Sequence, residues 1–250
     1  MNSVAPNRDA ELADALAAVR ARLTAAAEAA GRDPGEIALL PVTKFFPASD
    51  VVILHGLGCR DFGESREQEA SRKAGDVAAA LPGHPVRWHM VGRIQRNKAR
   101  AIARWAHVAH SVDSAKLVTA LDRAATEALT DGVRTAPLQV YLQLSLDGDV
   151  SRGGVDIGSP DLVDELCAAA DAAAGLDFVG FMAIPPLGAD PDEAFARLRA
   201  ERDRVQPNHP QRLGLSAGMS GDLEAAVKHG STCVRVGTAV MGSRPLQSPE

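Results

Sequence analysis

The stretch "ALLPVTKFFP", residues 38–47, is a short apolar run that ends abruptly in a lysine. Residues 37–43 are apolar or β-favouring, which is typical of a buried strand. Seven further runs of this kind follow, at residues 59–63, 86–92, 106–112, 138–144, 177–183, 212–216 and 232–237. Stretches with helical spacing of apolar residues separate them, such as Leu162, Leu166 and Ala169.

Eight strands that alternate with helices predict parallel pairing, because a parallel crossover needs a dozen or more residues and is usually helical. The strand runs are continuously apolar, as expected when helices cover the sheet. Eight such units in 250 residues favour an α/β fold with a single (β/α)8 barrel, a TIM barrel. An open doubly wound sheet is the alternative.

A helix is predicted before the first strand. Leu12, Leu16, Val19 and Leu23 follow one another at helical spacing. The predicted division is therefore an N-terminal helix in residues 1–34 that packs on the barrel, the barrel itself in residues 35–245, and a disordered tail in residues 246–250.

Composition excludes several classes of protein. The net charge of −5 argues against a nucleic-acid partner, and the basic segment "GRIQRNKARAIAR" (92–104) is interpreted as a solvated helix face. Three widely separated cysteines, Cys59, Cys167 and Cys233, predict reduced thiols in a cytoplasmic protein. No signal peptide and no apolar run of about 20 residues is present, so no membrane association is expected.

In a barrel of this kind, chemistry takes place at the carboxyl ends of the strands. Lys44 stands at the first of these ends, and it is one of only five lysines, against 22 arginines. The other four lie in polar, helix-like stretches, where a solvated lysine needs no special explanation. Lys44 could pair with a carboxylate, bind a phosphate, or attack a carbonyl carbon to form a Schiff base.

The last two units suggest an anion site. "LSAGMSGDLEAA" (215–226) predicts a strand, a glycine turn and a helix with Ser220 as its N-cap. "CVRVGTAVMG" (233–242) predicts a strand followed by a turn at Gly237 and Thr238. Barrels often bind phosphate in the loops after strands seven and eight, although these glycines could equally serve ordinary turns.

Other polar residues on the predicted strands leave their roles open. Arg235 lies near the end of the last strand, where it could pair with Glu64 or Asp61 or donate to a ligand. His89 and His110 are interpreted as packing residues, since no metal-binding or nucleophile motif surrounds them.

Six segments together resemble the pyridoxal phosphate homeostasis proteins, also called alanine-racemase N-terminal-domain-like or proline-synthetase co-transcribed proteins. The segments, in chain order, are "LLPVTKFFP", "DFGESREQEA", "WHMVGRIQRNKA", "HSVDSAK", "GFMAIPP" and "LSAGMSGDLEAAVKHGSTCVRVGTAVMGSR". The resemblance covers residues 37–244 and implies a (β/α)8 barrel that binds pyridoxal 5′-phosphate (PLP) as an aldimine of a lysine.

The resemblance also implies roles for single residues. Lys44 resembles the Schiff-base lysine of the family, and Arg235 resembles the arginine that approaches the pyridine nitrogen. The phosphate cradle implied by the resemblance consists of Ser216, Gly218, Gly237 and Thr238. The chain departs from the family pattern at residues 65 and 66, where Ser65 and Arg66 replace an asparagine and an aromatic residue.

Two functions fit the resemblance. The first is a non-catalytic carrier that takes part in intracellular PLP homeostasis, with PLP-dependent apo-enzymes as partners and a monomeric state expected. The second is an amino-acid racemase, which would need acid/base groups on both faces of the substrate. Alanine racemase draws its second base, a tyrosine, from another domain, whereas the only tyrosine here, Tyr141, lies within a predicted strand. A sugar-phosphate lyase that forms a Schiff base without PLP is a more distant alternative.

Overall fold

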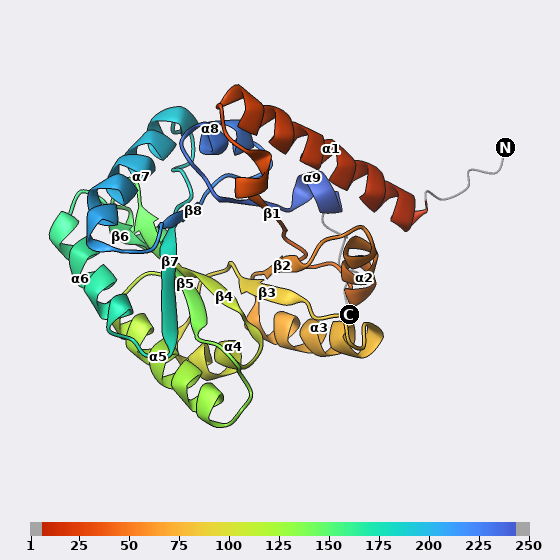
Figure 1. Cartoon of the computed structure of the whole chain (residues 1–250), viewed down its shortest axis with the longest axis horizontal. Coiled ribbons are helices and arrows are strands. Elements are labelled where there is room, and N and C mark those ends of the chain that lie inside the picture. Colours follow the sequence, from red (N-terminus) through yellow and green to blue (C-terminus); the bar gives the residue numbers. More distant parts are fainter. Residues whose placement is uncertain (1–6, 244–250) are drawn as a thin grey trace.

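The computed structural model describes residues 7–243 as a barrel of parallel strands surrounded by helices (Figure 1). The strands are β1 (Ala38–Pro41), β2 (Asp61–Glu64), β3 (Arg87–Met90), β4 (Val108–Val112), β5 (Leu138–Ser145), β6 (Val155–Asp156), β7 (Leu176–Met182), β8 (Gly214–Ser216) and β9 (Cys233–Val236). The α-helices are α1 (Arg8–Ala29), α2 (Ala48–Gly56), α3 (Glu67–Ala80), α4 (Ala99–Trp105), α5 (Ala115–Thr130), α6 (Pro160–Asp171), α7 (Pro191–Val205), α8 (Leu223–Lys228) and α9 (Thr238–Met241). Short 3-10 turns lie at Pro34–Glu36, Arg96–Lys98, Val150–Arg152 and Gln206–Asn208.

Strand pairing forms an almost complete ring. Its order is β1-β9-β8-β7-β5-β4-β3-β2, with every pair parallel. The ring closes between β1 and β2, where Val42 forms a parallel bridge with Gly63 and the Thr43 N–H donates to the Gly63 carbonyl. The predicted α/β class and the single (β/α)8 barrel are therefore confirmed, and the open doubly wound sheet is wrong.

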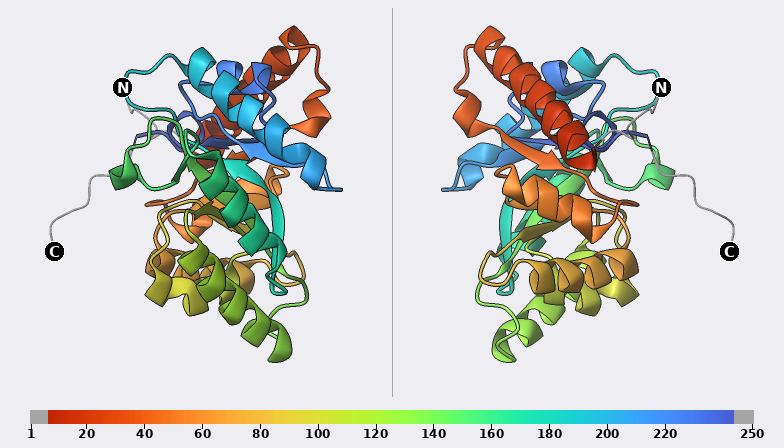
Figure 2. Two further views of the ribbon diagram at one scale, coloured as in Figure 1. Left: turned by 90° about the vertical axis from the view of Figure 1, so that its left-hand side faces the viewer. Right: turned by 90° about the vertical axis from the view of Figure 1, so that its right-hand side faces the viewer.

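Helix α1 forms part of the outer layer of the barrel. Leu12, Leu16 and Val19 are buried, and α1 contacts α2, α8 and α9 (Figure 2). Helix α9 has only four residues, too few to cover β9 and β1, so α1 supplies the missing apolar cover. Each of these fully buried aliphatic side chains contributes about 1.5–3 kcal/mol. The boundary between residues 34 and 35 stays a prediction, and the predicted tail, residues 246–250, lies outside the described residues.

The loop after β5 contains a strand that the sequence analysis treated as loop. β6 pairs with the end of β5, with Leu144 opposite Val155. Gly153 and Gly154 both have positive φ, and a Cβ on Gly154 would lie 2.7 Å from the backbone of Leu144. These two glycines let the chain fold back against β5, which residues with side chains would prevent.

The described part of the chain has neither a membrane-spanning helix nor a metal-binding group of side chains. Across residues 7–243, none of the helices has the length and apolar character needed to cross a membrane. Within the same range, no group of three or more histidine, cysteine or acidic side chains could hold a metal ion. Cys59, Cys167 and Cys233 are buried free thiols.

Candidate functional site

Lys44, Gly237 and Thr238 lie at the carboxyl ends of two adjacent strands. Lys44 follows β1 and the other two follow β9, and Pro41 of β1 stands opposite Val236 of β9. A Cβ on Gly237 would lie 3.7 Å from the carbonyl oxygen of Val42, two residues before the lysine. The structure therefore brings the predicted lysine and the predicted Gly-Thr turn to the same part of one mouth.

Three further predicted site residues lie deeper in the barrel, below this part of the mouth. They are Ser216, Gly218 and Arg235. Ser216 ends β8 opposite Cys233 of β9, and Gly218 accepts a hydrogen bond from the backbone N–H of Arg235. All three are buried, whereas Lys44 and Thr238 are exposed. The six predicted site residues thus form a rim of exposed groups above a buried polar floor.

The turn that carries Lys44 has an unusual backbone. Phe45 has φ = +71°, a conformation that costs free energy for any residue with a side chain. Its N–H donates to Oε1 of Glu69 at 2.6 Å, which holds the turn in this shape. The Lys44 ammonium and the Arg66 guanidinium both lie near the Phe45 ring, at 5.8 Å and 5.0 Å from its centroid. The backbone that carries Lys44 is therefore held in one defined turn.

The sequence analysis interpreted Lys73 as a solvated helix lysine, and this interpretation is wrong. Lys73 lies under the turn that carries Lys44. Its ammonium group is buried and donates to Oε1 of Glu64 at 2.6 Å and to the Thr43 carbonyl at 2.9 Å. The Thr43 hydroxyl donates to the same carboxylate oxygen at 2.7 Å. Burial raises the pKa of Glu64, and this effect outweighs the opposing influence of Lys73. Because Lys73 stands three residues after buried Ala70, its place on the inner face of α3 could have been read from the spacing.

Arg235 is almost completely buried, with 5% of its surface exposed. Its Nη1 donates to the backbone carbonyl and to Oγ of Ser216, both at 2.5 Å, and Nη2 donates to the Ala183 carbonyl at 3.2 Å. The ion pair considered with Glu64 or Asp61 does not form, since neither carboxylate contacts Arg235 among the described residues. Burial lowers the pKa of the guanidinium, which stays charged because an arginine pKa begins far above neutrality.

Ser220 plays a different part from the predicted one. It lies three residues before the first residue of α8, Leu223, and Asp222 occupies the N-cap position instead. The Ser220 hydroxyl accepts a hydrogen bond from the N–H of Ala239 at 3.3 Å. The loop after β8 is thereby tied to the first turn of α9, so the two predicted halves of the anion site are held together.

Gly218 gives a direct test of the packing under this loop. Its φ is +92°, and a Cβ would lie 2.6 Å from the Cβ of Ala226 in α8. We expect Gly218→Ala to lower the free energy of unfolding by about 1–3 kcal/mol, through backbone strain and overpacking. Urea denaturation measures this loss, with Gly221→Ala, where a Cβ meets nothing within 4 Å, as the matched control. Equal stability of the two variants would contradict the packing argument.

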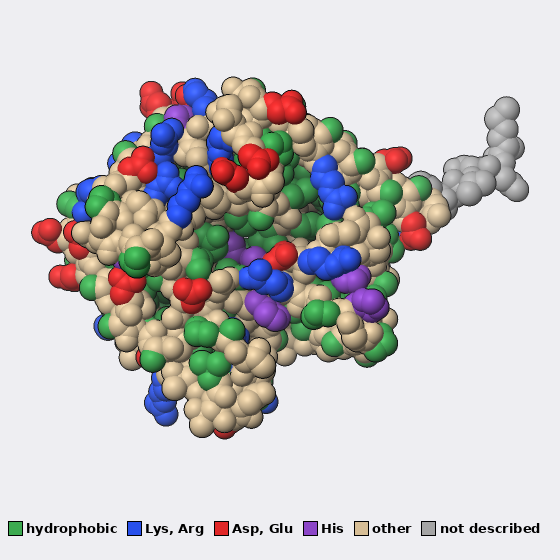
Figure 3. All heavy atoms as spheres, in the orientation of Figure 1, with side chains coloured by type: hydrophobic (Ala, Val, Ile, Leu, Met, Phe, Trp, Pro, Cys, Tyr) green, Lys and Arg blue, Asp and Glu red, His purple; other side chains and the backbone are tan. Residues whose placement is uncertain are grey.

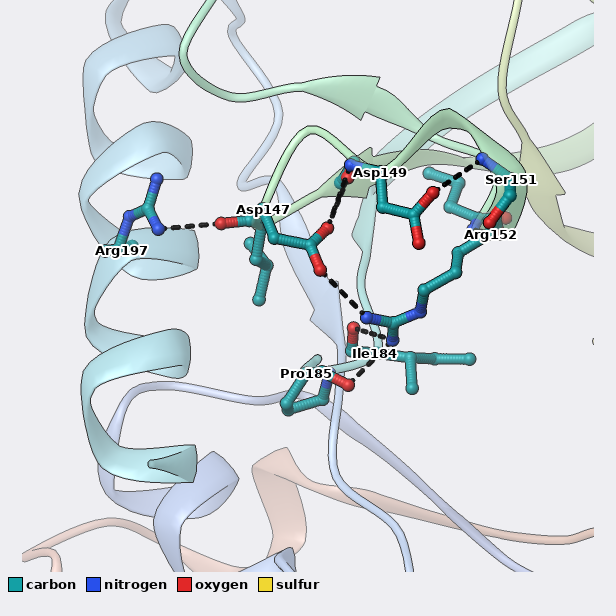
Figure 4. A network of polar contacts seen from close by, with 10 residues as sticks. Asp147, Asp149, Ser151, Arg152, Ile184, Pro185 and Arg197 are labelled. Carbon is teal, nitrogen blue, oxygen red and sulfur yellow. Dashed lines mark hydrogen bonds and ion pairs between the residues drawn. The ribbon is translucent and has the colours of Figure 1, made fainter. Parts of the chain in front are cut away.

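The loop after β5 is held at the same mouth by an arginine that sequence reasoning did not single out (Figure 4). Arg152 donates to the carbonyls of Ile184 and Pro185 in the loop after β7, and to the carboxylate of Asp147 in its own loop. The Arg152 carbonyl accepts from the side-chain amide of Gln143 on β5. Two loops at the mouth therefore have fixed positions relative to each other.

The chain matches a known protein family over most of its length. The family described as alanine racemase, N-terminal domain, matches residues 15–245. A "Pyridoxal phosphate homeostasis protein" of Mycobacterium tuberculosis is 63% identical over 99% of this chain and 98% of its own length. A protein of the same name from Escherichia coli is 34% identical over 94% of this chain and 97% of its own length.

Solved structures agree in fold. PipY of Synechococcus elongatus, described "with PLP bound", is 32% identical, with a TM-score of 0.77 over 92% of this chain and all of that one. Alanine racemase from Corynebacterium glutamicum is 17% identical, with a TM-score of 0.64 over 95% of this chain and 63% of that one. At this low identity, the second match indicates the barrel fold and nothing more.

Proposed function

Since this chain belongs to the family of pyridoxal phosphate homeostasis proteins, we propose that it binds PLP at the carboxyl mouth of its barrel and takes part in intracellular PLP homeostasis. The observation that carries this proposal is the position of Lys44 beside the turn at Gly237 and Thr238. An amine and an anion site that face one mouth suit a phosphorylated aldehyde held at both ends. PipY, described with PLP bound, has the same fold over its whole length.

Lys44 would hold the cofactor covalently. Its Nζ would bond to the aldehyde carbon with loss of water, a reaction that needs a neutral amine within reach of the carbonyl. The strained Phe45 backbone, bonded to Glu69, and the buried Lys73 together hold the backbone on both sides of Lys44. Such rigid support limits the conformational freedom that the lysine loses when the bond forms.

The phosphate would lie against the loops after β8 and β9. Gly218 leaves no room for a side chain and Gly237 presents bare backbone, so main-chain groups can approach an anion closely. The Thr238 hydroxyl is exposed at the rim, where it could donate to a phosphate. The Ser216 hydroxyl lies in the buried floor between His110 and Arg235, so it would border the site while the Thr238 hydroxyl and main-chain N–H groups donate to the phosphate.

Arg235 bears on how strongly a bound cofactor would be activated. PLP serves as an electron sink when its ring nitrogen is protonated, and a permanently charged guanidinium near this nitrogen disfavours protonation by like-charge repulsion. Arg235 is buried and bonded to Ser216 and Ala183, so it is not free to leave its position. We infer that the bound cofactor is stored in a form that is poorly activated for carbanion chemistry.

Racemisation would also require a second base. Tyr141 is the only tyrosine, and its ring stacks on His110 at 4.7 Å within the barrel. Burial raises the pKa of its hydroxyl, which disfavours the phenolate form that removes a proton. Tyr141 also lines a cavity with Cys59 and Arg60, which stand just before the amino end of β2. It is therefore placed away from the lysine.

Isotope exchange distinguishes the two functions. The holo-protein is incubated with L-alanine, and separately with L-serine, in deuterated water, and deuterium at Cα is measured by mass spectrometry. The carrier function predicts no incorporation above a borohydride-reduced control. Incorporation at many turnovers per minute would establish the racemase alternative.

Further features of the function are proposals of the same kind. We propose that the chain acts as a monomer in the cytoplasm and that it exchanges PLP with PLP-dependent apo-enzymes. Gel filtration of the holo-protein, with and without an added apo-enzyme, tests the first and the last of these statements.

Thr238→Val tests the phosphate end. Valine has nearly the shape of threonine but lacks the hydroxyl, so we expect PLP binding to weaken by about 1–3 kcal/mol. Absorbance titration of the apo-protein with PLP measures the change. Thr119→Val on α5 serves as the control, because its hydroxyl bonds only the Ala115 carbonyl of its own helix. An unchanged affinity in Thr238→Val would contradict the role of this hydroxyl.

A further inference from the structure

A continuous line of side-chain hydrogen bonds crosses the inside of the barrel. Asp61 Oδ1 lies 2.8 Å from His89 Nε2, and His89 Nδ1 lies 2.9 Å from His110 Nε2. His110 Nδ1 lies 2.8 Å from Oγ of Ser216, which accepts from Arg235 at 2.5 Å. The five residues come from β2, β3, β4, β8 and β9. A carboxylate and a guanidinium thus stand at the two ends of a line that joins five strands.

The chemistry of the groups fixes the direction of every bond. Ionised Asp61 can only accept, so His89 donates to it through Nε2. Burial keeps both imidazoles neutral, since it lowers the pKa of His89 and of His110. A neutral His89 must then accept at Nδ1 from Nε2 of His110, and a neutral His110 must accept at Nδ1 from the Ser216 hydroxyl.

The guanidinium of Arg235 can only donate hydrogen bonds, so Ser216 Oγ accepts from it. All four bonds therefore run in one direction, from the guanidinium to the carboxylate. Bonds aligned in this way polarise one another. Burial opposes ionisation of Asp61, but the bond from His89 and the charge of Arg87 outweigh it and lower its pKa. The carboxylate is thus ionised, as the direction requires.

The line has little freedom to rearrange. His110 is completely buried, and its ring lies at 25° to the ring of Tyr141, with 4.7 Å between their centroids. The outer end reaches a cavity of about 480 Å³ lined by Asp61, His89, Arg87 and Cys233. On the face shown in Figure 3, histidine and charged side chains gather around a central hollow.

We propose that Asp61, His89 and His110 are positioning residues that hold Arg235, through Ser216, in the orientation in which it faces the ring of the cofactor. This inference rests on the proposed function, because it concerns the ring end of the same site. His110 and His89 act through other side chains and touch no ligand. Cutting the line would leave the Ser216 hydroxyl free to turn, and Arg235 would lose a fixed acceptor. The environment of the cofactor ring would change as a result.

The first test needs neither a variant nor the cofactor. Nitrogen-15 NMR of the histidine-labelled apo-protein at pH 7.5 reports which ring nitrogen carries the proton. We expect both His89 and His110 to be neutral, with the proton on Nε2. A proton on Nδ1 of His110, or a cationic ring at either residue, would overturn the proposed direction.

The second test cuts the line and follows the cofactor. His110→Phe keeps a ring against Tyr141 but removes both bonding nitrogens. We expect the dissociation constant of PLP to rise about tenfold and the visible absorption maximum of the holo-protein to shift. Asp171→Asn is the matched control, because it alters another carboxylate–histidine contact, with His209 at 3.3 Å, on α6. It should change neither quantity.

The outcomes separate this inference from the function on which it rests. If the wild-type protein fails to take up PLP, the proposed function is wrong, and the NMR experiment still decides the direction of the line. If the wild-type protein binds PLP, while His110→Phe matches it in affinity and absorption maximum, the positioning role is wrong and the proposed function stands.

Discussion

Lys44→Ala should abolish covalent retention of PLP, because it removes the amine that we propose to bond with the aldehyde. The side chain is exposed at the rim of the barrel, so its loss should change the free energy of unfolding by less than about 0.5 kcal/mol. The holo-protein is reduced with borohydride, denatured and desalted, and the PLP that remains on the protein is measured by absorbance. We expect about one PLP per wild-type chain and none on the variant.

Lys116→Ala is the matched control for this experiment. Lys116 is also exposed, in the first turn of α5, and it follows the carboxyl end of β4. A general reaction of PLP with surface lysines would lower the label equally in both variants. If Lys44→Ala kept the label at the wild-type level, another amine would hold the cofactor.

Lys73→Met should be the most destabilising of the changes considered. It removes the cation that balances Glu64, whose side chain is completely buried, and it leaves the carbonyl of Thr43 without a partner for its second lone pair. Removing one partner of a buried ion pair lowers the free energy of unfolding by about 3–5 kcal/mol. Burial of the methionine side chain offsets only part of this loss. Urea denaturation of the apo-protein measures the loss.

The double variant Lys73→Met/Glu64→Gln separates charge from packing. Glutamine carries no charge and still accepts the hydroxyl of Thr43, so we expect it to recover more than half of the lost stability. A loss below about 1 kcal/mol in Lys73→Met alone would contradict a structural role of the pair. A double variant as unstable as the single one would show that packing, rather than charge, causes the loss.

The number and order of the eight barrel strands were predictable because each of these eight strands carries its own signal. Continuous apolar runs between helical periods recur eight times, and parallel pairing follows from the length of each crossover. The ends of strands were less predictable: β2 begins at Asp61 rather than at residue 59, and β8 at Gly214 rather than at residue 212. β6 was missed because a two-residue strand is too short to show a period.

The positions of candidate site residues were predictable where these residues directly follow a strand. Lys44 follows β1 and Thr238 follows β9, so their shared mouth could be inferred from the barrel rule alone. The resemblance to pyridoxal phosphate homeostasis proteins is confirmed by the matched relatives.

The residues that the sequence analysis missed have roles that arise from contacts between distant parts of the chain. Lys73 was overlooked because its partner Glu64 lies on a strand and the pair is visible only when α3 packs on β2. The line from His89 to Ser216 spans 127 positions, and no local pattern reports it. Each of these histidines alone resembles an ordinary packing residue.

Peptide mass mapping tests the central claim most directly. The holo-protein is reduced with borohydride and digested, and the peptides are searched for the added mass of a pyridoxyl group. We predict that the group is found on Lys44, in the peptide that contains "VTKFFP" (42–47), at close to one per chain. A pyridoxyl group on any other lysine, or on none, would contradict the proposed site.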